Sequence, residues 1–262
     1  MHTNSADNYP IIYPLPAFDD NYIWAVETSP GHAFVVDPGD ATPVLHWLQT
    51  NQLQLDTILI THHHMDHIGG VSALVERTAA RVYAPLDDRL ADTFHSIDAS
   101  CTVKLGGLSF SVLEVPGHTR SHISYYCAQA KLLFCGDALF SMGCGRMFEG
   151  NPAQMLASLD KFVALPDTTA IYCTHEYTEA NGRFALAVEP GNLALQKRCQ
   201  QVTELRQLKQ ITLPVALATE KQTNPFLRCD HAEVIAAAKH RNSSVSNRVD
   251  VFATLRSWKD GF

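Results

Sequence analysis

The feature that most constrains this chain is a run of metal-binding residue types placed directly after an apolar segment. Residues 57–70 read Thr-Ile-Leu-Ile-Thr-His-His-His-Met-Asp-His-Ile-Gly-Gly. The apolar part predicts a buried strand, in which side chains two residues apart point the same way. His62 and His64 therefore converge on one point near the end of that strand. Asp66 and His67 follow where the backbone turns, and the glycine pair lets the next element begin close by.

Imidazole and carboxylate ligands together suit zinc, iron or manganese better than calcium or magnesium, which prefer oxygen ligands. The alternative is a histidine-rich surface tract that binds metal adventitiously. Such a tract is expected at a terminus or in a polar loop, whereas this one follows an apolar, strand-forming segment. The sequence therefore predicts a specific metal site.

The bulk properties of the 262-residue chain describe a soluble globular protein, built as one large domain or as a main domain with a smaller one. Hydrophobic residues make up 46% of the chain and charged residues 18%, which predicts a substantial core. The net charge of −7 gives no general attraction to nucleic acid. Any anionic ligand must therefore be bound by locally placed cations.

The cysteines and the start of the chain both favour the cytoplasm. The seven cysteines are odd in number, widely scattered and without a Cys-x-x-Cys pair, a pattern typical of reduced thiols. Residues 1–8 lack the layout of a signal peptide, and no apolar run approaches the length that spans a membrane. We expect a cytoplasmic protein that binds neither membrane nor nucleic acid.

Strand-like runs alternate with amphipathic segments through the first two-thirds of the chain, which predicts an α/β or α+β layered domain. Helices are expected near residues 42–52, 69–78 and 152–165, the last with Asn151 as N-cap and Pro152 at its first position. The strand-like runs are residues 22–26, 33–37, 57–61, 81–83, 110–115, 123–127, 131–135 and 170–173.

The character of the chain changes after about residue 178. Apolar residues repeat at helical spacing over residues 195–208, and helix-favouring segments recur near residues 231–240 and 247–259. We therefore divide the chain into a main domain over residues 1–177 and a smaller helical C-terminal domain over residues 178–262.

Three further candidate ligands follow strand-like runs far downstream: His118, Asp137 and His175. Side chains at strand ends are held by a rigid scaffold and still reach an open cleft. Each of them alone is more typical of a turn or core residue. Together with the first cluster they make five histidines and two aspartates, enough for two metal ions that share one carboxylate.

Four motifs in this order, T-H-x-H-x-D-H, P-G-H-T, F-x-G-D and T-H-E-Y, resemble those of the metallo-β-lactamase superfamily. Further segments narrow the resemblance to glyoxalase II, the hydroxyacylglutathione hydrolases: residues 16–22, 143–146, 175–178 and 224–228. The resemblance covers nearly the whole chain. It implies a four-layer αββα sandwich of class α/β (α+β), followed by a smaller helical C-terminal domain.

The resemblance also implies a binuclear metal centre, with three ligands for each ion and one bridging carboxylate. The two sets and the bridge are, in turn, His62, His64 and His118; Asp66, His67 and His175; and Asp137, which bridges together with a water or hydroxide. Zinc is the expected metal in both sites, and iron and manganese stay open. Asp66 and Asp137 are the expected catalytic carboxylates.

Glutathione, by the same resemblance, is bound by Arg146, Tyr177, Arg256 and Lys259. Taken alone, these cations are typical of solvated surface charge, but an acidic protein must gather cations locally to bind the two carboxylates of glutathione. Arg256 and Lys259 lie three residues apart, which places both on one face of a helix. Some family members carry lysine in place of Arg146 and tyrosine in place of Phe148. Because Phe148 cannot donate a hydroxyl hydrogen bond, that contact is not expected here.

The expected activity is metal-dependent hydrolysis of S-(2-hydroxyacyl)glutathione thioesters, such as S-lactoylglutathione, to glutathione and a 2-hydroxy carboxylate. Two ions can lower the pKa of a bridging water toward about 7 and polarise the carbonyl that the resulting hydroxide attacks. The thiol leaving group has a pKa of about 8.5, so it can depart as thiolate without a protein acid. Cys144 has no evident partner base and is expected to be structural. We expect a monomer whose partner is the small-molecule thioester.

The leading alternative is an iron-dependent glutathione persulfide dioxygenase on the same fold, with one ion bound by two histidines and one carboxylate. The complete second set of ligands and the helical C-terminal region argue against it. A non-enzymatic binding module would lack a ligand, and the sequence contains all seven. Lactonases and nucleases share the metal motif, and the residues implied for glutathione disfavour them.

Overall fold

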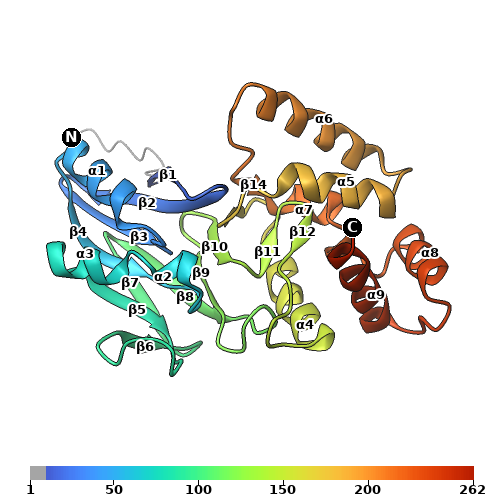
Figure 1. Cartoon of the computed structure of the whole chain (residues 1–262), viewed down its shortest axis with the longest axis horizontal. Helices are drawn as coiled ribbons and strands as arrows, with labels where there is room; N and C mark the ends of the chain where they lie inside the picture. The colour runs from blue at the N-terminus through green and yellow to red at the C-terminus, as the bar shows by residue number, and fades with distance from the viewer. Residues whose placement is uncertain (1–9) are drawn as a thin grey trace, which may run out of the picture.

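The computed structural model describes residues 10–262. Two β-sheets pack face to face, and helices cover their outer faces (Figure 1). Aromatic rings fill the space between the sheets. The ring of Phe34 from the first sheet lies 5.5 Å from that of Phe110 and 6.2 Å from that of Phe134, both from the second. This arrangement confirms the predicted four-layer α/β sandwich.

The first sheet has the strand order β1-β2-β3-β4-β5-β6. Its strands are β1 (Ile11–Ala17), β2 (Asn21–Ser29), β3 (His32–Val36), β4 (Gln54–Leu59), β5 (Arg81–Pro85) and β6 (His95–Ile97). The first three strands pair antiparallel, and β3 to β6 pair parallel. Parallel neighbours need crossover connections. Helices form two of them: α1 (Ala41–Asn51) between β3 and β4, and α2 (Met65–Ile68) with α3 (Val71–Thr78) between β4 and β5. Residues 86–94 connect β5 to β6 without a helix.

The second sheet has the order β14-β13-β10-β9-β8-β7. Its strands are β7 (Thr102–Leu105), β8 (Leu108–Glu114), β9 (Ile123–Cys127), β10 (Leu132–Gly136), β13 (Ala170–Cys173) and β14 (Val215–Ala216). Its one parallel pair, β10 with β13, is connected through α4 (Pro152–Val163). As predicted, Asn151 caps this helix, in a capping box with Gln154, and proline starts it.

Helices dominate the chain after β13. They are α5 (Thr178–Val188), α6 (Leu193–Gln207), α7 (Leu217–Thr223), the 3-10 helix η1 (Pro225–Leu227), α8 (Ala232–Arg241) and α9 (Arg248–Asp260). Phe184, Phe226 and Phe252 of this region belong to the same buried cluster as the sheet residues. The region also supplies β14, which pairs with β13. The predicted helical region is therefore confirmed, while the boundary between residues 177 and 178 stays a prediction.

The strands and helices differ from the expectations mainly at their ends. The helix expected near residues 69–78 is α3, whereas the short helix α2 before it and the short strands β1, β6 and β7 were not expected. β1 contains Pro14 and Pro16, which a central strand excludes but an edge strand tolerates. Among residues 10–262, no helix has the length and apolar character needed to cross a membrane.

Candidate metal centre and adjoining cavity

The metal-binding motif begins just beyond the carboxyl end of β4. The backbone amide and the hydroxyl of Thr61 donate to the two carboxylate oxygens of the buried Asp37, each at 2.7 Å. Asp37 follows β3, so these bonds join the ends of two neighbouring strands. His62 comes directly after this anchored residue, and His64 is the N-cap of α2. The anchored strand end therefore determines where both rings lie.

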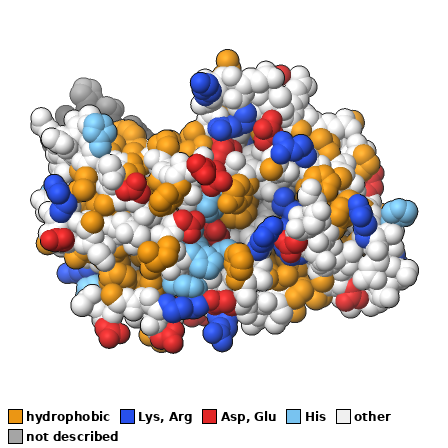
Figure 2. Space-filling view, in the orientation of Figure 1, with side chains coloured by type: hydrophobic (Ala, Val, Ile, Leu, Met, Phe, Trp, Pro, Cys, Tyr) orange, Lys and Arg blue, Asp and Glu red, His pale blue; other side chains and the backbone are white. Residues whose placement is uncertain are grey.

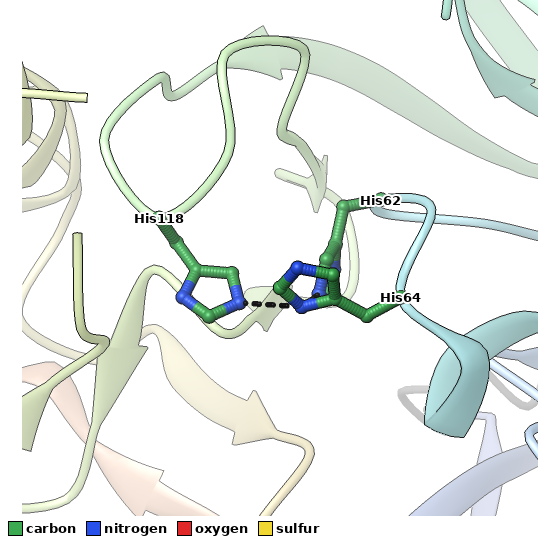
Figure 3. Close-up of side chains that lie close together, drawn as sticks. All are labelled: His62, His64 and His118. Atoms are coloured by element: carbon green, nitrogen blue, oxygen red, sulfur yellow. Dashed lines mark hydrogen bonds between the residues drawn. The ribbon is translucent and has the colours of Figure 1, made fainter. Parts of the chain in front are cut away.

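His62, His64 and His118 turn ring nitrogens toward one point (Figure 3). Nδ1 of His64 lies 3.1 Å from Nε2 of His62 and 3.1 Å from Nε2 of His118. Zinc–nitrogen bonds of about 2.0–2.1 Å in a tetrahedral arrangement separate two ligand nitrogens by about 3.3 Å. Both separations from Nδ1 of His64 are therefore close to the spacing that a metal ion imposes on its ligands.

Asp66, His67 and His175 form the second set. Oδ2 of Asp66 lies 3.3 Å from Nε2 of His175 and 3.5 Å from Nε2 of His67. Asp137 lies between the two sets, with Oδ1 3.4 Å from Nε2 of His67 and Oδ2 3.5 Å from Nε2 of His118. The structure thus brings all seven predicted ligands together, and Asp137 contacts a ligand of each set.

Three of these histidines present Nε2 to the centre and are held through Nδ1 by a neighbouring oxygen. The Nδ1 contacts are His67 with Asp37 at 3.0 Å, His175 with Asp20 at 2.7 Å, and His118 with the carbonyl oxygen of Arg146 at 2.8 Å. Such contacts fix the tautomer and orientation of a ligating ring. The sequence did not identify Asp37 or Asp20. Asp37 follows a strand-like run, the same signal that identified the downstream ligands.

His122 is a further residue that the sequence did not identify. Its Nε2 accepts a hydrogen bond from the backbone amide of Asp137 at 3.1 Å, and its ring stacks on that of His62 at 4.7 Å. Gly136 makes this approach possible. It has φ of +52°, and a Cβ on it would lie 2.5 Å from Oγ1 of Thr61 and 2.8 Å from the His122 ring. His122 therefore helps to fix the backbone at Asp137.

Burial and neighbouring charges set the protonation of the centre. Burial holds the pKa of His62 and of His118 below the usual range, and burial together with His118 lowers the pKa of His64 to about 4. These rings are therefore neutral at pH 7, the form that binds metal. Burial alone would raise the pKa of Asp137, but the neighbouring His67 and His175 hold the pKa of this carboxyl well below its usual range.

Among the buried ligand atoms without a hydrogen-bond partner within residues 10–262, Nε2 of His67 and Oδ1 of Asp137 lie 3.4 Å from each other. Buried polar atoms without a partner are costly, and a metal ion in contact with them would remove that cost. Imidazole and carboxylate are donors that zinc, iron and manganese share. The residues therefore fit a divalent metal site.

A cavity of about 430 Å³ adjoins the metal centre and is lined in part by His118 and Asp137. The four predicted glutathione residues line it as well: Arg146, Tyr177, Arg256 and Lys259. Figure 2 shows histidine side chains gathered in the middle of this face, with Lys and Arg side chains beside them. The structure thus places the predicted substrate residues next to the predicted metal ligands.

The three cations of the cavity differ in how firmly they are held. Arg256 is only 3% exposed, and its guanidinium donates to the carbonyl oxygen of Cys144 at 2.7 Å and to Asp260 at 3.0 Å. The side chain of Arg146 is 62% exposed. Lys259 is half-buried, and burial lowers its pKa to about 8. Their roles in binding glutathione stay predictions.

Two aromatic side chains of the cavity lie against the metal ligands. The ring of Tyr177 stacks on that of His175, with centroids 4.7 Å apart and planes 4° apart. Phe148 is 64% exposed and makes edge contacts with His64 at 5.5 Å and His118 at 5.3 Å. An apolar ring therefore lies beside the first set of ligands, at the position where some family members carry tyrosine.

Cys144 is buried, and burial raises the pKa of its thiol. A protonated, buried thiol is a poor nucleophile, in agreement with the structural role expected for this residue. Gly145 follows it and passes close to Asp137: a Cβ here would lie 2.0 Å from the carbonyl oxygen of Asp137. The Gly-Cys-Gly segment therefore serves to bring the backbone against the metal centre.

Comparisons with known proteins give a family match for each of the two parts of the chain. Residues 17–94 and 102–175 match the metallo-beta-lactamase superfamily, and residues 176–262 match the family described as hydroxyacylglutathione hydrolase C-terminus. A hydroxyacylglutathione hydrolase from Albidiferax ferrireducens is 52% identical over 254 residues, covering 96% of this chain and 99% of that protein. Another, from Aeromonas hydrophila, is 52% identical over 257 residues, covering 97% of this chain and all of that protein.

A solved structure described as TTHA1623 in a di-iron-bound form is 25% identical, with a TM-score of 0.58, and covers 83% of this chain and 100% of that one. The full-length relatives, the two family matches and the assembled ligand sets agree with one another. This chain belongs to the hydroxyacylglutathione hydrolases, the glyoxalase II family of the metallo-β-lactamase superfamily.

Proposed function

We propose that this chain hydrolyses S-(2-hydroxyacyl)glutathione thioesters, such as S-lactoylglutathione, to glutathione and a 2-hydroxy carboxylate. The observation that carries the proposal is the junction of a complete seven-ligand centre with a cavity that three cations line. Relatives with 52% identity over nearly the whole chain are hydroxyacylglutathione hydrolases. Site and family therefore support the same activity.

We propose further that the centre holds two zinc ions, one in each set of three ligands, with Asp137 shared. The di-iron form of TTHA1623 supports a pair of ions on this fold. When bound, two such ions would supply an activated water at neutral pH and polarise the carbonyl under attack. The unpartnered atoms of His67 and Asp137 support a role for both in holding metal.

The carboxylates of Asp66 and Asp137 would orient the attacking water. Both lie where the two sets of ligands meet. The amide of Asn21 donates to Oδ2 of Asp66 at 3.1 Å, which limits the rotation of that carboxylate. A hydrogen bond from the water to either carboxylate would direct its lone pair at the thioester carbonyl.

The cavity cations would bind the tripeptide. Glutathione carries two carboxylates, and Arg146, Arg256 and Lys259 supply the local positive charge that a chain of net charge −7 otherwise lacks. The glutathione thiol has a pKa of about 8.5 and can leave as thiolate. No side-chain acid is therefore required at the leaving group.

The alternative, an iron-dependent persulfide dioxygenase, is not favoured. A single-ion enzyme needs two histidines and one carboxylate, whereas this centre assembles two complete sets around Asp137. The C-terminal match to hydroxyacylglutathione hydrolases, over residues 176–262, also favours the hydrolase.

The experiment measures three quantities on the purified protein: metal ions per chain, hydrolysis of S-lactoylglutathione, and oxygen uptake with glutathione persulfide. We expect two ions per chain, hydrolysis that a strong chelator abolishes and added metal restores, and no oxygen uptake. His118→Ala should empty one site and His175→Ala the other, with the exposed His32→Ala as control. Oxygen uptake by a protein that leaves the thioester intact would replace this function with the dioxygenase.

We also propose that the enzyme is a cytoplasmic monomer whose main domain ends at residue 177. The seven cysteines are all free, which supports a reducing compartment. Sedimentation measurements test the monomer, and fractionation of cells tests the compartment. Limited proteolysis near residue 177 tests the domain boundary.

A further inference from the structure

Asp260, the last residue of α9, contacts two of the three cations that line the cavity. Its Oδ1 lies 3.0 Å from Nη2 of Arg256 and 3.4 Å from Nε of Arg146. Lys259 is its chain neighbour. A single carboxylate oxygen is therefore the common counter-ion of side chains that come from α9 and from the loop after β12 (Gly143–Cys144).

The two contacts differ in strength. Arg256 is almost fully buried, and it holds its place through the carbonyl oxygen of Cys144 as well as through Asp260. The pair of Asp260 with Arg146 is open to water, because the two side chains are 44% and 62% exposed. An exposed pair of this kind contributes little and exchanges partners readily. An incoming carboxylate can therefore take Arg146 while Arg256 stays fixed.

Asp260 could instead be an ordinary surface charge that ends a helix. The helix itself gives no reason for an acid there, because a negative charge at a helix C-terminus opposes the helix dipole. The contacts of its carboxylate lie with the cavity cations instead. Within residues 10–262, the only acidic residue that lines the cavity is the metal ligand Asp137. Asp260 is thus the negative charge that opposes the three cations without occupying the cavity wall.

We infer that Asp260 sets the affinity of the cavity for glutathione by partly neutralising Arg146, Arg256 and Lys259. The inference rests on the proposed glutathione site. The thioester substrate and the product glutathione carry the same glycine carboxylate, so Asp260 weakens the binding of both by the same factor. The cost in substrate affinity is offset by faster release of the product. Asp260 does not touch the reacting atoms, so it sets the affinity of the cavity and is not a catalytic residue.

The test is Asp260→Asn, which removes the charge and keeps the shape. We expect the KM for S-lactoylglutathione and the dissociation constant of glutathione, measured by calorimetry, to fall together. The expected decrease is about three- to tenfold, as Coulomb's law gives for unit charges about 6 Å apart in a medium between water and a protein surface. Asp260→Glu keeps the charge and should stay within about twofold of the wild type. Asp230→Asn is the matched control, because Asp230 pairs with Arg248 at the other end of α9, at 2.8 Å.

A second substrate distinguishes an electrostatic effect of Asp260 from an effect on the shape of the cavity. It is S-lactoylglutathione with its glycine carboxylate converted to a primary amide. Asp260→Asn should leave the KM of this amide unchanged. An equal decrease for both substrates would mean that Asp260 acts through the shape of the cavity, and the inference would be wrong. Unchanged or raised constants for the normal substrate would also overturn it, while leaving the proposed function intact. A wild type that neither hydrolyses the thioester nor binds glutathione would overturn both.

Discussion

The candidate metal centre and the cavity beside it share His118 and Asp137, yet their remaining residues differ in how firmly they are held in place. Around the metal centre, ligand rings are fixed on their far side by a carboxylate or carbonyl oxygen, and His62 and His67 are fully buried. Around the cavity, Arg256 is buried and held by the carbonyl oxygen of Cys144, but Arg146 is mostly exposed and pairs with a carboxylate that is also exposed. We therefore expect the chemistry, which requires exact geometry, in the rigid region, and the recognition of a flexible tripeptide in the more adaptable one.

The largest effect is expected when Asp137, which contacts ligands of both sets, is removed from the rigid metal centre. Asp137→Ala takes away the carboxylate that contacts both sets of ligands. We expect both sites to lose metal affinity and kcat/KM to fall by about a thousandfold or more, because metal-ion catalysis is worth several kcal/mol. Metal analysis and steady-state kinetics measure the two effects. A variant that keeps full activity with one ion per chain would disprove the binuclear mechanism.

A smaller effect is expected when a support of the centre is changed and every ligand is kept. Asp37 accepts hydrogen bonds from the amide and hydroxyl of Thr61 and contacts Nδ1 of His67. In Asp37→Asn one oxygen becomes an NH2 group, which cannot accept a hydrogen bond. We expect metal affinity to fall by about 10- to 100-fold, as for other residues that orient a ligand. Chelator competition measures it.

The control for this variant is Asp56→Asn. Asp56 also pairs with a histidine, His32 at 2.8 Å, but on the exposed surface. It should leave metal affinity unchanged. If Asp37→Asn behaved like this control, the rigidity of the centre would not depend on the residues behind the ligands.

In the adaptable region, Arg256→Ala with Lys259→Ala should act mainly on binding. As the proposed ligands of glutathione, these cations would contact a part of the substrate that does not change in the reaction, so KM should rise by about tenfold or more while kcat changes less. The effect should be larger at low ionic strength, where charges are less screened. Because Arg256 also bonds the carbonyl oxygen of Cys144, the double variant should unfold at a lower temperature. Lys259→Ala alone isolates the charge effect, and an unaltered KM would show that glutathione is bound elsewhere.

The sequence predicts the rigid region more completely than the adaptable one. Metal ligands must be particular residue types at strand ends, so all seven could be named before their positions were known. The contacts of Asp37 and Asp20 with ligand rings were not predicted, because an aspartate near the end of a strand can have many roles. Only the fold shows which histidine ring each of them contacts. Arg256 was expected to face the substrate, and its near-complete burial depends on Cys144, which lies 112 residues away in the chain.

Long-range contacts of the C-terminal helices are the part that local patterns could not predict. The buried Glu220 of α7 accepts hydrogen bonds from the hydroxyl of Ser141 and the amide of Met142, each at 2.8 Å. These bonds hold the turn between β11 (Leu139–Phe140) and β12. Phe140, which directly precedes this turn, packs its ring 5.7 Å from the ring of His175. An acid in a short helix is usually solvated, and nothing in the sequence near residue 220 indicates this partner.

The smallest expected effect is a pH dependence of KM that arises in the cavity, at Lys259. Burial, with a contribution from Arg256, lowers the pKa of Lys259 to about 8. The other groups that act on it are the raised-pKa thiol of Cys144, the carboxylate of Asp260 and the guanidinium of Arg146. Lys259 is therefore charged below pH 8 and neutral above it. We expect the KM for S-lactoylglutathione to be constant below about pH 7 and to rise by about three- to tenfold above pH 8, the worth of one partly screened charge.

The matched variant for this prediction is Lys259→Arg, whose guanidinium stays charged throughout the range, so its KM should not rise. Asp260→Asn should move the rise to lower pH, because the Asp260 charge favours the protonated form of Lys259. Both changes concern KM, whereas titration within the metal centre acts on kcat. A KM that rose equally in the wild type and in Lys259→Arg would assign the pH dependence to a group other than Lys259.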